Sequence, residues 1–191
     1  MNQRIPRAFF SCSLQGEDYQ YNSFVETIIR NAGFEPFGTV CKFTFSPQPI
    51  PISMREELQK ADCLIVAATP RYFQKNLHNN NNSTYAMSEI IHTEIGMAYM
   101  RNIPILVFKS PYVNIGNFLP SITQYIDPVI YQNNQYGFDI KIINNYFQNT
   151  YNNIIQNWEK EQNEKIVEGV KIGLGIIGGL TVLNFFFNND N

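Results

Sequence analysis

The chain has 191 residues, of which 44% are hydrophobic and 16% charged, with a formal net charge of −2 at pH 7. This length and apolar content suit one domain of ordinary size with a sizeable core. The near-neutral balance, without a cluster of Lys and Arg, excludes nucleic acid as an expected partner. The three widely spaced cysteines indicate neither a disulfide framework nor a zinc site, and they favour a reducing compartment.

The first quarter of the chain alternates between strand and helix patterns. The apolar run 7–13 predicts a strand. Apolar residues at helical spacing over 17–34 predict a helix that ends at Gly33. An extended, aromatic pattern then predicts a second strand over 35–45.

A second helix and a buried strand follow. Residues 51–61 predict a helix, with Ser53 as its N-cap and Glu56 completing a capping box. The continuous apolar run 62–69 predicts a strand that is buried on both faces, as in a parallel sheet. A polar, Asn-rich loop is expected over 70–84.

The remaining elements are a helix over 85–102, a strand over 103–108, a weaker strand over 125–131 and a long helix over 139–166. Strands that alternate with helices predict an α/β fold. We expect a flavodoxin-like, three-layer arrangement with a central, mainly parallel sheet. Ligands of such sheets bind at the carboxyl ends of the strands, so we expect the functional site at that edge.

The C-terminal part differs from the α/β domain, which is expected over 1–135. A C-terminal helix is expected over 136–165. Apart from Glu168 and Lys171, the residues that follow are uncharged, and they predict a transmembrane or oligomerisation segment over 166–188, whose uncharged, glycine-containing run is 172–187. This run approaches the ~20 residues that cross a bilayer. Gly175 and Gly179 form a GxxxG face, which lets helices pack closely in a membrane. Packing in an oligomer core and disorder are the alternatives.

Three segments follow one another in an order that resembles Toll/interleukin-1 receptor (TIR) domains. "AFFSCSLQGEDYQYNSFVETIIRNAGFEPF" resembles their first strand, Gly-Glu-Asp and first helix, and "ISMREELQKADCLIVAATPRYF" resembles the next helix, buried strand and loop. "STYAMSEI" resembles a motif in which Ser and Trp precede a glutamate, with Tyr85 in place of the Trp. The resemblance covers residues 7–110 and implies that the chain cleaves NAD and releases nicotinamide.

A second resemblance concerns "EIGMAYMRNIPILVF", which is similar to a segment of nucleoside 2-deoxyribosyltransferases. The Asp-Pro-Gly-type loop that precedes the glutamate in that family is absent, and the Asn run stands in its place. Both families break an N-glycosidic bond with one glutamate near the start of a helix. A single carboxylate next to the anomeric carbon can stabilise an oxocarbenium-like sugar or capture it covalently.

Two glutamates are candidates for this carboxylate. The spacing from Tyr85 selects Glu89, whereas the spacing to Ala98 and Pro104 selects Glu94. Five residues of helix turn through about 500°, which leaves the two side chains about 140° apart, so they cannot face the same cleft. We prefer Glu94, because packing fixes a helix-to-strand spacing whereas the loop before Glu89 absorbs insertions. Glu89 remains the alternative, and the other glutamate would be a solvated or helix-dipole residue.

The resemblance implies further substrate contacts at the same edge: Phe10, Ser11 and Ser13 at the end of the first strand, Thr69 and Tyr72 after the buried strand, and Phe45 as a stacking partner for a base. Strand-end capping, a surface turn and core packing are the alternatives for these three groups. His92 and His78 have no nucleophile partner in the pattern and are expected to be structural or solvated. No phosphate-binding loop or GxGxxG motif follows the first strand, which argues against kinase and hydride-transfer chemistry.

The function that the first resemblance implies is an NAD-cleaving, TIR-like enzyme of bacterial antiphage defence, acting as an NAD glycohydrolase or an ADP-ribosyl cyclase that produces a nucleotide signal. A deoxyribosyltransferase-like enzyme and a non-catalytic TIR scaffold are the alternatives. NAD is expected as the substrate, with no cofactor and no metal. We expect a homo-oligomer, a downstream effector that reads the product, and a cytoplasmic domain tethered to the inner membrane by the C-terminal segment.

The apolar segment 166–188 makes a prediction of its own. If it inserts into a bilayer, the full-length protein resists extraction with alkaline carbonate and is released by detergent, because insertion buries the apolar side chains in lipid. Membrane fractionation followed by immunoblotting measures this. Release by carbonate alone would contradict the anchor.

Overall fold

The computed structural model describes residues 4–39, 42–43, 47–75, 83–116, 119–130 and 136–160. Its contacts divide the chain into two compact units, residues 1–150 and residues 151–191. The described part of the second unit, residues 151–160, is helical. The first unit holds the sheet.

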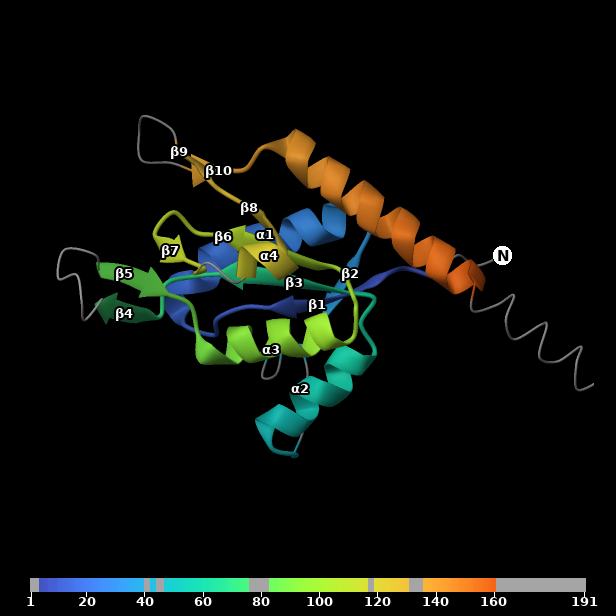
Figure 1. The fold of residues 1–191 in the computed structure, drawn as a ribbon, viewed down its shortest axis with the longest axis horizontal. Helices are drawn as coiled ribbons and strands as arrows, with labels where there is room; N and C mark the ends of the chain where they lie inside the picture. Colours follow the sequence, from blue (N-terminus) through green and yellow to red (C-terminus); the bar gives the residue numbers. More distant parts are fainter. Residues whose placement is uncertain are drawn as a thin grey trace, which may run out of the picture. The chain divides into compact units, whose positions relative to one another are not determined.

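A five-stranded sheet forms the centre of the first unit, with the strand order β2-β1-β3-β6-β8 (Figure 1). All neighbouring strands are parallel. The strands are β1 (Arg7–Ser11), β2 (Glu35–Phe37), β3 (Cys63–Ala68), β6 (Ile105–Lys109) and β8 (Gln124–Ile126). This is the flavodoxin-like order, and it confirms the predicted α/β fold with a central parallel sheet.

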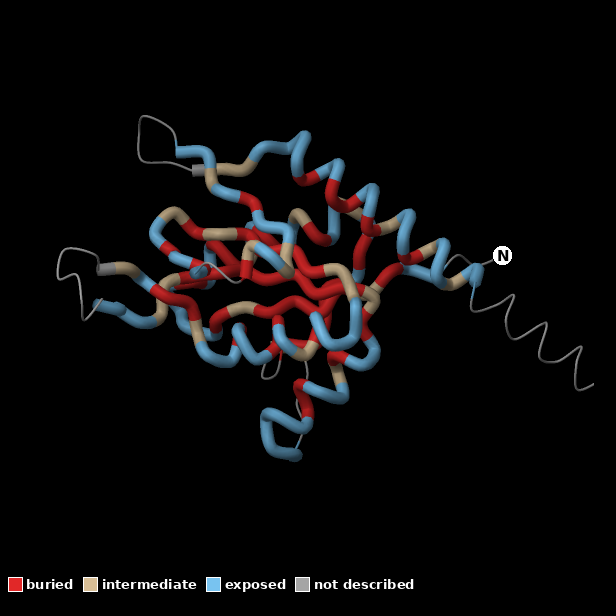
Figure 2. The backbone as a smooth tube through the Cα atoms, in the orientation of Figure 1, coloured by how far each residue is buried: buried red, intermediate tan, exposed pale blue. Residues whose placement is uncertain are grey.

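Helices cover both faces of this sheet (Figure 1). On one face α1 (Tyr19–Asn31) packs, and on the other α2 (Ile50–Gln59) and α3 (Glu89–Met100). All six residues of β3 are buried, as the uninterrupted apolar run predicted, because both faces of this strand are covered. Figure 2 shows the buried residues concentrated in the sheet and on the inner sides of the helices.

Alternate residues of the strands build two cores. Phe9, Leu64 and Val107 point to the side of α3, where Ile91, Ile95 and Ala98 of that helix join the same apolar cluster. On the opposite face the ring of Phe138 packs against Phe108, at 5.2 Å between centroids, and against Phe24, at 6.0 Å. The burial of α3 against the first of these two cores, the one that contains Phe9, fixes which side chains of the helix point to the edge of the sheet.

Residues 72–75 and 83–86 form strands where the sequence predicted a polar loop and the start of a helix, and residues 76–82 of that loop lie outside the described residues. β4 (Tyr72–Lys75) and β5 (Ser83–Ala86) pair antiparallel, and β7 (Val113–Asn114) joins β5 in a second small sheet. The rings of Phe73 and Tyr85 pack across the hairpin at 5.6 Å, a cross-strand contact that the helical reading of Tyr85 missed. As a consequence α3 begins at Glu89 rather than at Tyr85.

The start of α2 also differs from the prediction. Its N-cap is Pro49, whose carbonyl accepts from the backbone N–H groups of Ile52 and Ser53 at 2.9 and 3.2 Å. Pro51 therefore lies in the first turn, where a missing N–H costs nothing. Ser53 is buried inside the helix, so the predicted capping box with Glu56 is wrong.

The first unit also contains four short elements among its described residues: η1 (Gly16–Asp18), α4 (Leu119–Ile122), β9 (Val129–Ile130) and β10 (Tyr136–Gly137). The single strand expected over 125–131 is divided between β8 and β9, with Pro128 at the break. Helix extends over 140–160, and residues 161–166 of the predicted long helix lie outside the described residues.

Within the part of the chain that the structure describes, no helix has both the length and the apolar character needed to cross a membrane. The predicted transmembrane or oligomerisation segment, 166–188, lies outside that part.

Gly38, which follows β2, provides a test of how this strand is held. It has φ +94, and a Cβ at this position would overlap the ring of Phe9, which is fully buried in β1. We expect Gly38→Ala to lower the free energy of unfolding by about 2–4 kcal/mol, because left-handed backbone strain adds to overpacking. Urea unfolding followed by circular dichroism measures the change.

Two further glycines are matched controls for this prediction. Gly33→Ala should cost about 1 kcal/mol, because Gly33 has φ +84 but open space around it. Gly16→Ala should change stability by less than about 0.5 kcal/mol, since neither strain nor contact opposes a Cβ there. Equal effects at all three positions would contradict the role assigned to the Phe9 contact.

Candidate active site

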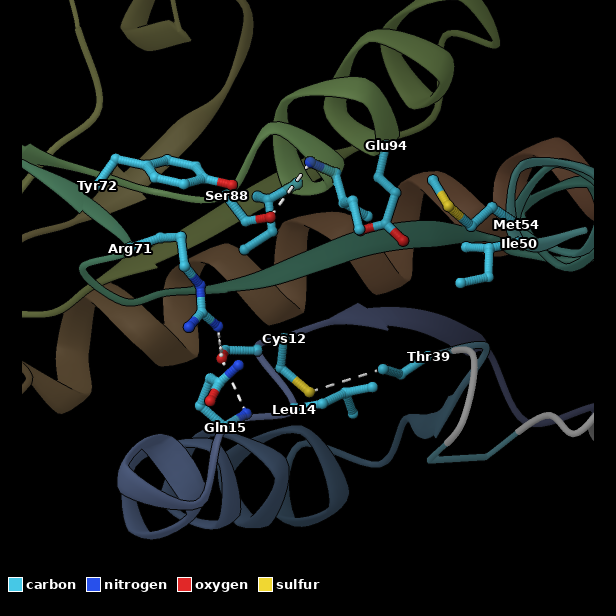
Figure 3. A pocket seen from close by; sticks show the side chains of 13 residues that line it. Cys12, Leu14, Gln15, Thr39, Ile50, Met54, Arg71, Tyr72, Ser88 and Glu94 are labelled. Atoms are coloured by element: carbon cyan, nitrogen blue, oxygen red, sulfur yellow. Dashed lines mark hydrogen bonds between the residues drawn. The ribbon is translucent and has the colours of Figure 1, made fainter.

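A pocket of about 380 Å³ opens at the carboxyl edge of the parallel sheet. It lies where β1 and β3 are neighbours and the chain leaves them toward opposite faces, which is the usual ligand position in a flavodoxin-like sheet. Segments after β1, β2 and β3 supply one part of its lining, and α2 and α3 supply the other (Figure 3). The lining residues are Cys12, Ser13, Leu14, Gln15, Thr39, Ile50, Met54, Arg71, Tyr72, Ser88, Ile90, Ile91 and Glu94.

Glu94 brings a carboxyl group into this pocket from α3 (Figure 3). Its side chain lies in the second turn of the helix, next to Ile91 and Ile95, which hold this face of α3 against the sheet. Ser11, the last residue of β1, donates a hydrogen bond from its hydroxyl to Glu94 Oε2. Glu94 is only 6% exposed and Ser11 only 1%. A buried acid is therefore held at the end of the strand by one hydrogen bond.

Burial controls the charge of this acid. Removal from water disfavours the carboxylate and raises the pKa of Glu94 to about 7, although the hydrogen bond from Ser11 acts in the opposite direction. Near neutral pH the site thus contains both the ionised and the protonated form. A carboxyl group of this kind can act as a nucleophile or as a proton donor.

The second candidate, Glu89, occupies a different environment. It is the first residue of α3, is exposed, and does not line the pocket. A negative charge in the first turn of a helix is stabilised by the helix dipole. The structure therefore brings Glu94, and not Glu89, to the pocket.

The other predicted site residues divide into three groups. Ser13 and Tyr72 line the pocket, and Ser11 contacts its acid. Phe10 and Thr69 are buried but do not line it. Phe45 lies outside the described residues.

Phe10 shows why proximity along the chain does not place a side chain in the site. Its ring points to the opposite face of the sheet from Ser11, which contacts Glu94, because successive side chains of a strand alternate between faces. There it lies 5.0 Å from the ammonium group of Lys42. Only its backbone takes part in the edge of the sheet, where its carbonyl accepts from the hydroxyl of Thr39.

Cys12 is also close to the acid but lacks the properties of a nucleophile. Its Sγ is 3.7 Å from Thr39 Oγ1, and burial raises the pKa of the thiol, against the attraction of Lys42. A neutral thiol reacts slowly. Cys12 is therefore part of the wall of the pocket, and the ionisable chemistry belongs to Glu94.

Sequence reasoning missed several pocket residues. Arg71 could have been found, because it follows the buried strand at the edge where ligands bind. Thr39, Ile50 and Met54 carry no such signal, since the tertiary packing of α2 and the segment after β2 brings them to the pocket. Among the described residues, no group of three or more His, Cys, Asp or Glu could hold a metal ion. His92 is exposed, and His78 lies outside those residues.

Comparison with known proteins adds little to this geometry. No family model and no curated protein matches the chain. Among solved structures, the chain is similar to a CMP N-glycosidase from Clostridium botulinum at 14% identity, over 66% of this chain and 89% of that chain, with a TM-score of 0.40. A likeness this distant does not bear on function, and the resemblance to TIR domains stays a prediction.

The raised pKa of Glu94 predicts a pH-dependent stability difference between the wild type and Glu94→Gln. Below pH 4.5 both the folded and the unfolded state hold the proton. Between pH 4.5 and about 7 only the folded state holds it, so the wild type loses stability as the pH rises, by up to about 3 kcal/mol. The neutral amide, which can still accept from Ser11, does not titrate.

Urea unfolding of both proteins at pH 4, 6 and 8 measures this difference. The stability of Glu94→Gln relative to the wild type should rise from pH 4 to pH 8. A stability difference that is constant with pH would show that Glu94 has an ordinary pKa.

Proposed function

We propose that the chain is an enzyme that breaks the N-glycosidic bond of a nucleoside or nucleotide, with Glu94 as the catalytic carboxylate. One observation supports this above the others. A single acid, buried and held by Ser11, reaches a pocket at the ligand-binding edge of the sheet. The volume of about 380 Å³ is at the lower end of ligand pockets, roughly 300–1,000 Å³, and suits one nucleoside.

The two oxygens of the carboxyl group have different roles in this mechanism. Oε2 accepts from Ser11, while Oε1 has no hydrogen-bond donor among the described residues and is left for the substrate. Oε1 attacks C1′ of the sugar as the C1′–N bond breaks, and the bonding electron pair leaves with the base. A nicotinamide leaves neutral without a proton, whereas a purine or pyrimidine leaves as an anion and takes up a proton from the solvent.

Water completes the cycle. Its oxygen attacks C1′ of the glycosyl ester as the C1′–Oε1 bond breaks, which releases the sugar product and restores the carboxylate, and the water gives up one proton to the solvent. The hydrogen bond from Ser11 holds the carboxyl group in one orientation, so little freedom is lost when the substrate arrives. The apolar wall formed by Ile50, Met54 and Ile91 keeps the reacting charges in a medium of low dielectric, where electrostatic stabilisation is strongest.

Each of the two resemblances implies a different substrate for this reaction. The TIR-like order of segments implies that NAD is the substrate and that the product, ADP-ribose or a cyclic derivative, is a nucleotide signal in antiphage defence. A homo-oligomer, an effector that reads the signal and a membrane tether through 166–188 belong to this version. The spacing around Glu94, which resembles that of deoxyribosyltransferases, implies a 2′-deoxynucleoside or its nucleotide as the substrate instead. The position of Glu94 supports glycosidic cleavage in both versions.

Glu94→Gln tests the proposal directly. We expect kcat to fall by about 10²–10⁴-fold, because an amide can neither attack C1′ nor exchange a proton. Chromatographic release of free base from NAD, deoxynucleosides and their 5′-phosphates is the measurement. Glu89→Gln, an equal change of charge on the same helix, should keep activity within about twofold. Loss with Glu89→Gln but not with Glu94→Gln would reverse the assignment, and no turnover of any of these substrates would favour a scaffold.

The ionised form of Glu94 is the reactive one, so its pKa sets the pH profile. We expect kcat/KM to rise as the pH increases through about 7 and then to level off. Initial rates between pH 5 and 9 at constant ionic strength measure this. A rate that falls through the same range would mean that the protonated form acts, as a general acid.

A further inference from the structure

Arg71 enters the pocket with most of its hydrogen-bonding capacity unused. Its backbone N–H donates to Ala86 O at 2.7 Å, which fixes the residue at the start of β4. Its guanidinium group donates to Ser13 Oγ at 2.5 Å. A guanidinium group has five N–H donors, and among the described residues no carboxylate pairs with this one. A half-buried cation of this kind is ready to bind an anion.

Ser13 has an unused donor next to this cation. Its oxygen accepts two hydrogen bonds, from Arg71 and from the backbone N–H of Gln15 at 3.2 Å. Both lone pairs are therefore occupied, and the hydroxyl proton has no acceptor among the described residues. The carbonyl of Ser13 accepts from Asn22 Nδ2 at 2.7 Å, which holds the segment after β1 in place. Arg71 and Ser13 thus form a fixed set of donors that lacks an acceptor.

The position of this donor set relative to the acid matches a nucleotide. Glu94 reaches the pocket from α3, whereas Arg71 and Ser13 reach it from the segments that follow β3 and β1 (Figure 3). Arg71 and Glu94 line the same pocket without forming an ion pair, so a ligand group can lie between them. In a nucleotide the glycosidic bond at C1′ and the C5′-phosphate carried by C4′ are likewise separated by the ribose ring.

We propose that Arg71 and Ser13 bind a phosphate group of the substrate, so that the pocket takes 5′-phosphorylated nucleosides in preference to free nucleosides. This inference rests on the proposed function only in assuming that the ribose lies between the two groups. Arg71 supplies two parallel N–H groups to the phosphate oxygens, the geometry that a guanidinium shares with phosphate, and Ser13 adds its O–H. Neither residue takes part in bond breaking.

Arg71 has an alternative, purely structural role, as a brace between the start of β4 and the segment after β1. A brace stabilises the protein and is indifferent to the phosphate. A phosphate-binding residue discriminates between two ligands that differ only by that group. Binding selectivity therefore separates the two roles, provided that stability is recorded for each variant.

Ribose 5-phosphate and ribose are suitable probes, because they need neither a particular base nor turnover. Isothermal titration calorimetry of the full chain should show ribose 5-phosphate binding at least about tenfold more tightly than ribose, since charge-assisted hydrogen bonds to the phosphate are added. Arg71→Gln should remove this preference and leave the affinity for ribose unchanged. Arg71→Lys should keep part of it, because the charge remains but the bidentate geometry is lost.

Arg55→Gln is the matched control, because Arg55 is exposed on α2 and does not line this pocket. It loses the same charge, so a general electrostatic effect would appear in both variants. The proposal is overturned if the wild type fails to bind ribose 5-phosphate at millimolar concentration, or binds both sugars equally. It is also overturned if Arg71→Gln keeps the preference, or if Arg55→Gln abolishes it.

The binding and turnover experiments test the anion site and the proposed function separately. Loss of all glycosidic cleavage with the phosphate preference intact would remove the proposed function and keep the anion site. Cleavage of free nucleosides and their 5′-phosphates with equal kcat/KM would remove the anion site and keep the function. The phosphate could belong to a mononucleotide or to a dinucleotide such as NAD. Comparing kcat/KM for nicotinamide mononucleotide and NAD distinguishes these two cases, because a preference for the dinucleotide requires contacts beyond the described pocket.

Discussion

The contact between Ser11 and Glu94 is the constraint on which the site depends. It joins the last residue of β1 to the second turn of α3, two segments that are distant in the sequence. Both residues are buried, so the contact exists only when the strand and the helix are packed in one register. The same packing removes water from the carboxyl group and raises its pKa to about 7. Position and acidity of the candidate catalytic group therefore have one physical origin.

The order of the strands explains why a pocket forms at this place. Because β1 lies between β2 and β3, the chain leaves neighbouring strands toward opposite faces, and the segments after them diverge. Polar groups that follow the strands, such as Ser13 and Arg71, then surround a space whose other walls come from helices. Apolar side chains on α2 and α3 lower the dielectric, and the few polar groups gain in strength. The arrangement combines an acid that is uncharged half of the time near neutral pH with a cation that is always charged.

The errors in the sequence-based predictions have identifiable physical causes. Tyr85 fits a helical pattern, but its ring packs against Phe73 across a hairpin, and α3 starts later. Ser53 has the spacing of a capping box, yet Pro49 begins the helix one turn earlier. Phe10 adjoins Ser11 in the sequence, and the alternation of a strand directs it to the opposite face. At Tyr85 a contact with another strand overrode the local pattern, whereas at Ser53 and Phe10 a different local feature decided the outcome.

The sequence by itself determined the class of fold, the buried strand at 62–69 and the pair of glutamates to consider. Hydrophobic periodicity and helix-to-strand spacing are local properties, and they are sufficient for this. Tertiary structure alone decided that Glu94 lies in a pocket, that Ser11 donates a hydrogen bond to it, and that the guanidinium group of Arg71 lines the same pocket with N–H donors that have no acceptor among the described residues. Burial and hydrogen bonding depend on which segments meet in space. The chemistry of the site thus comes from the packing of β1, β3 and α3 rather than from any one of them.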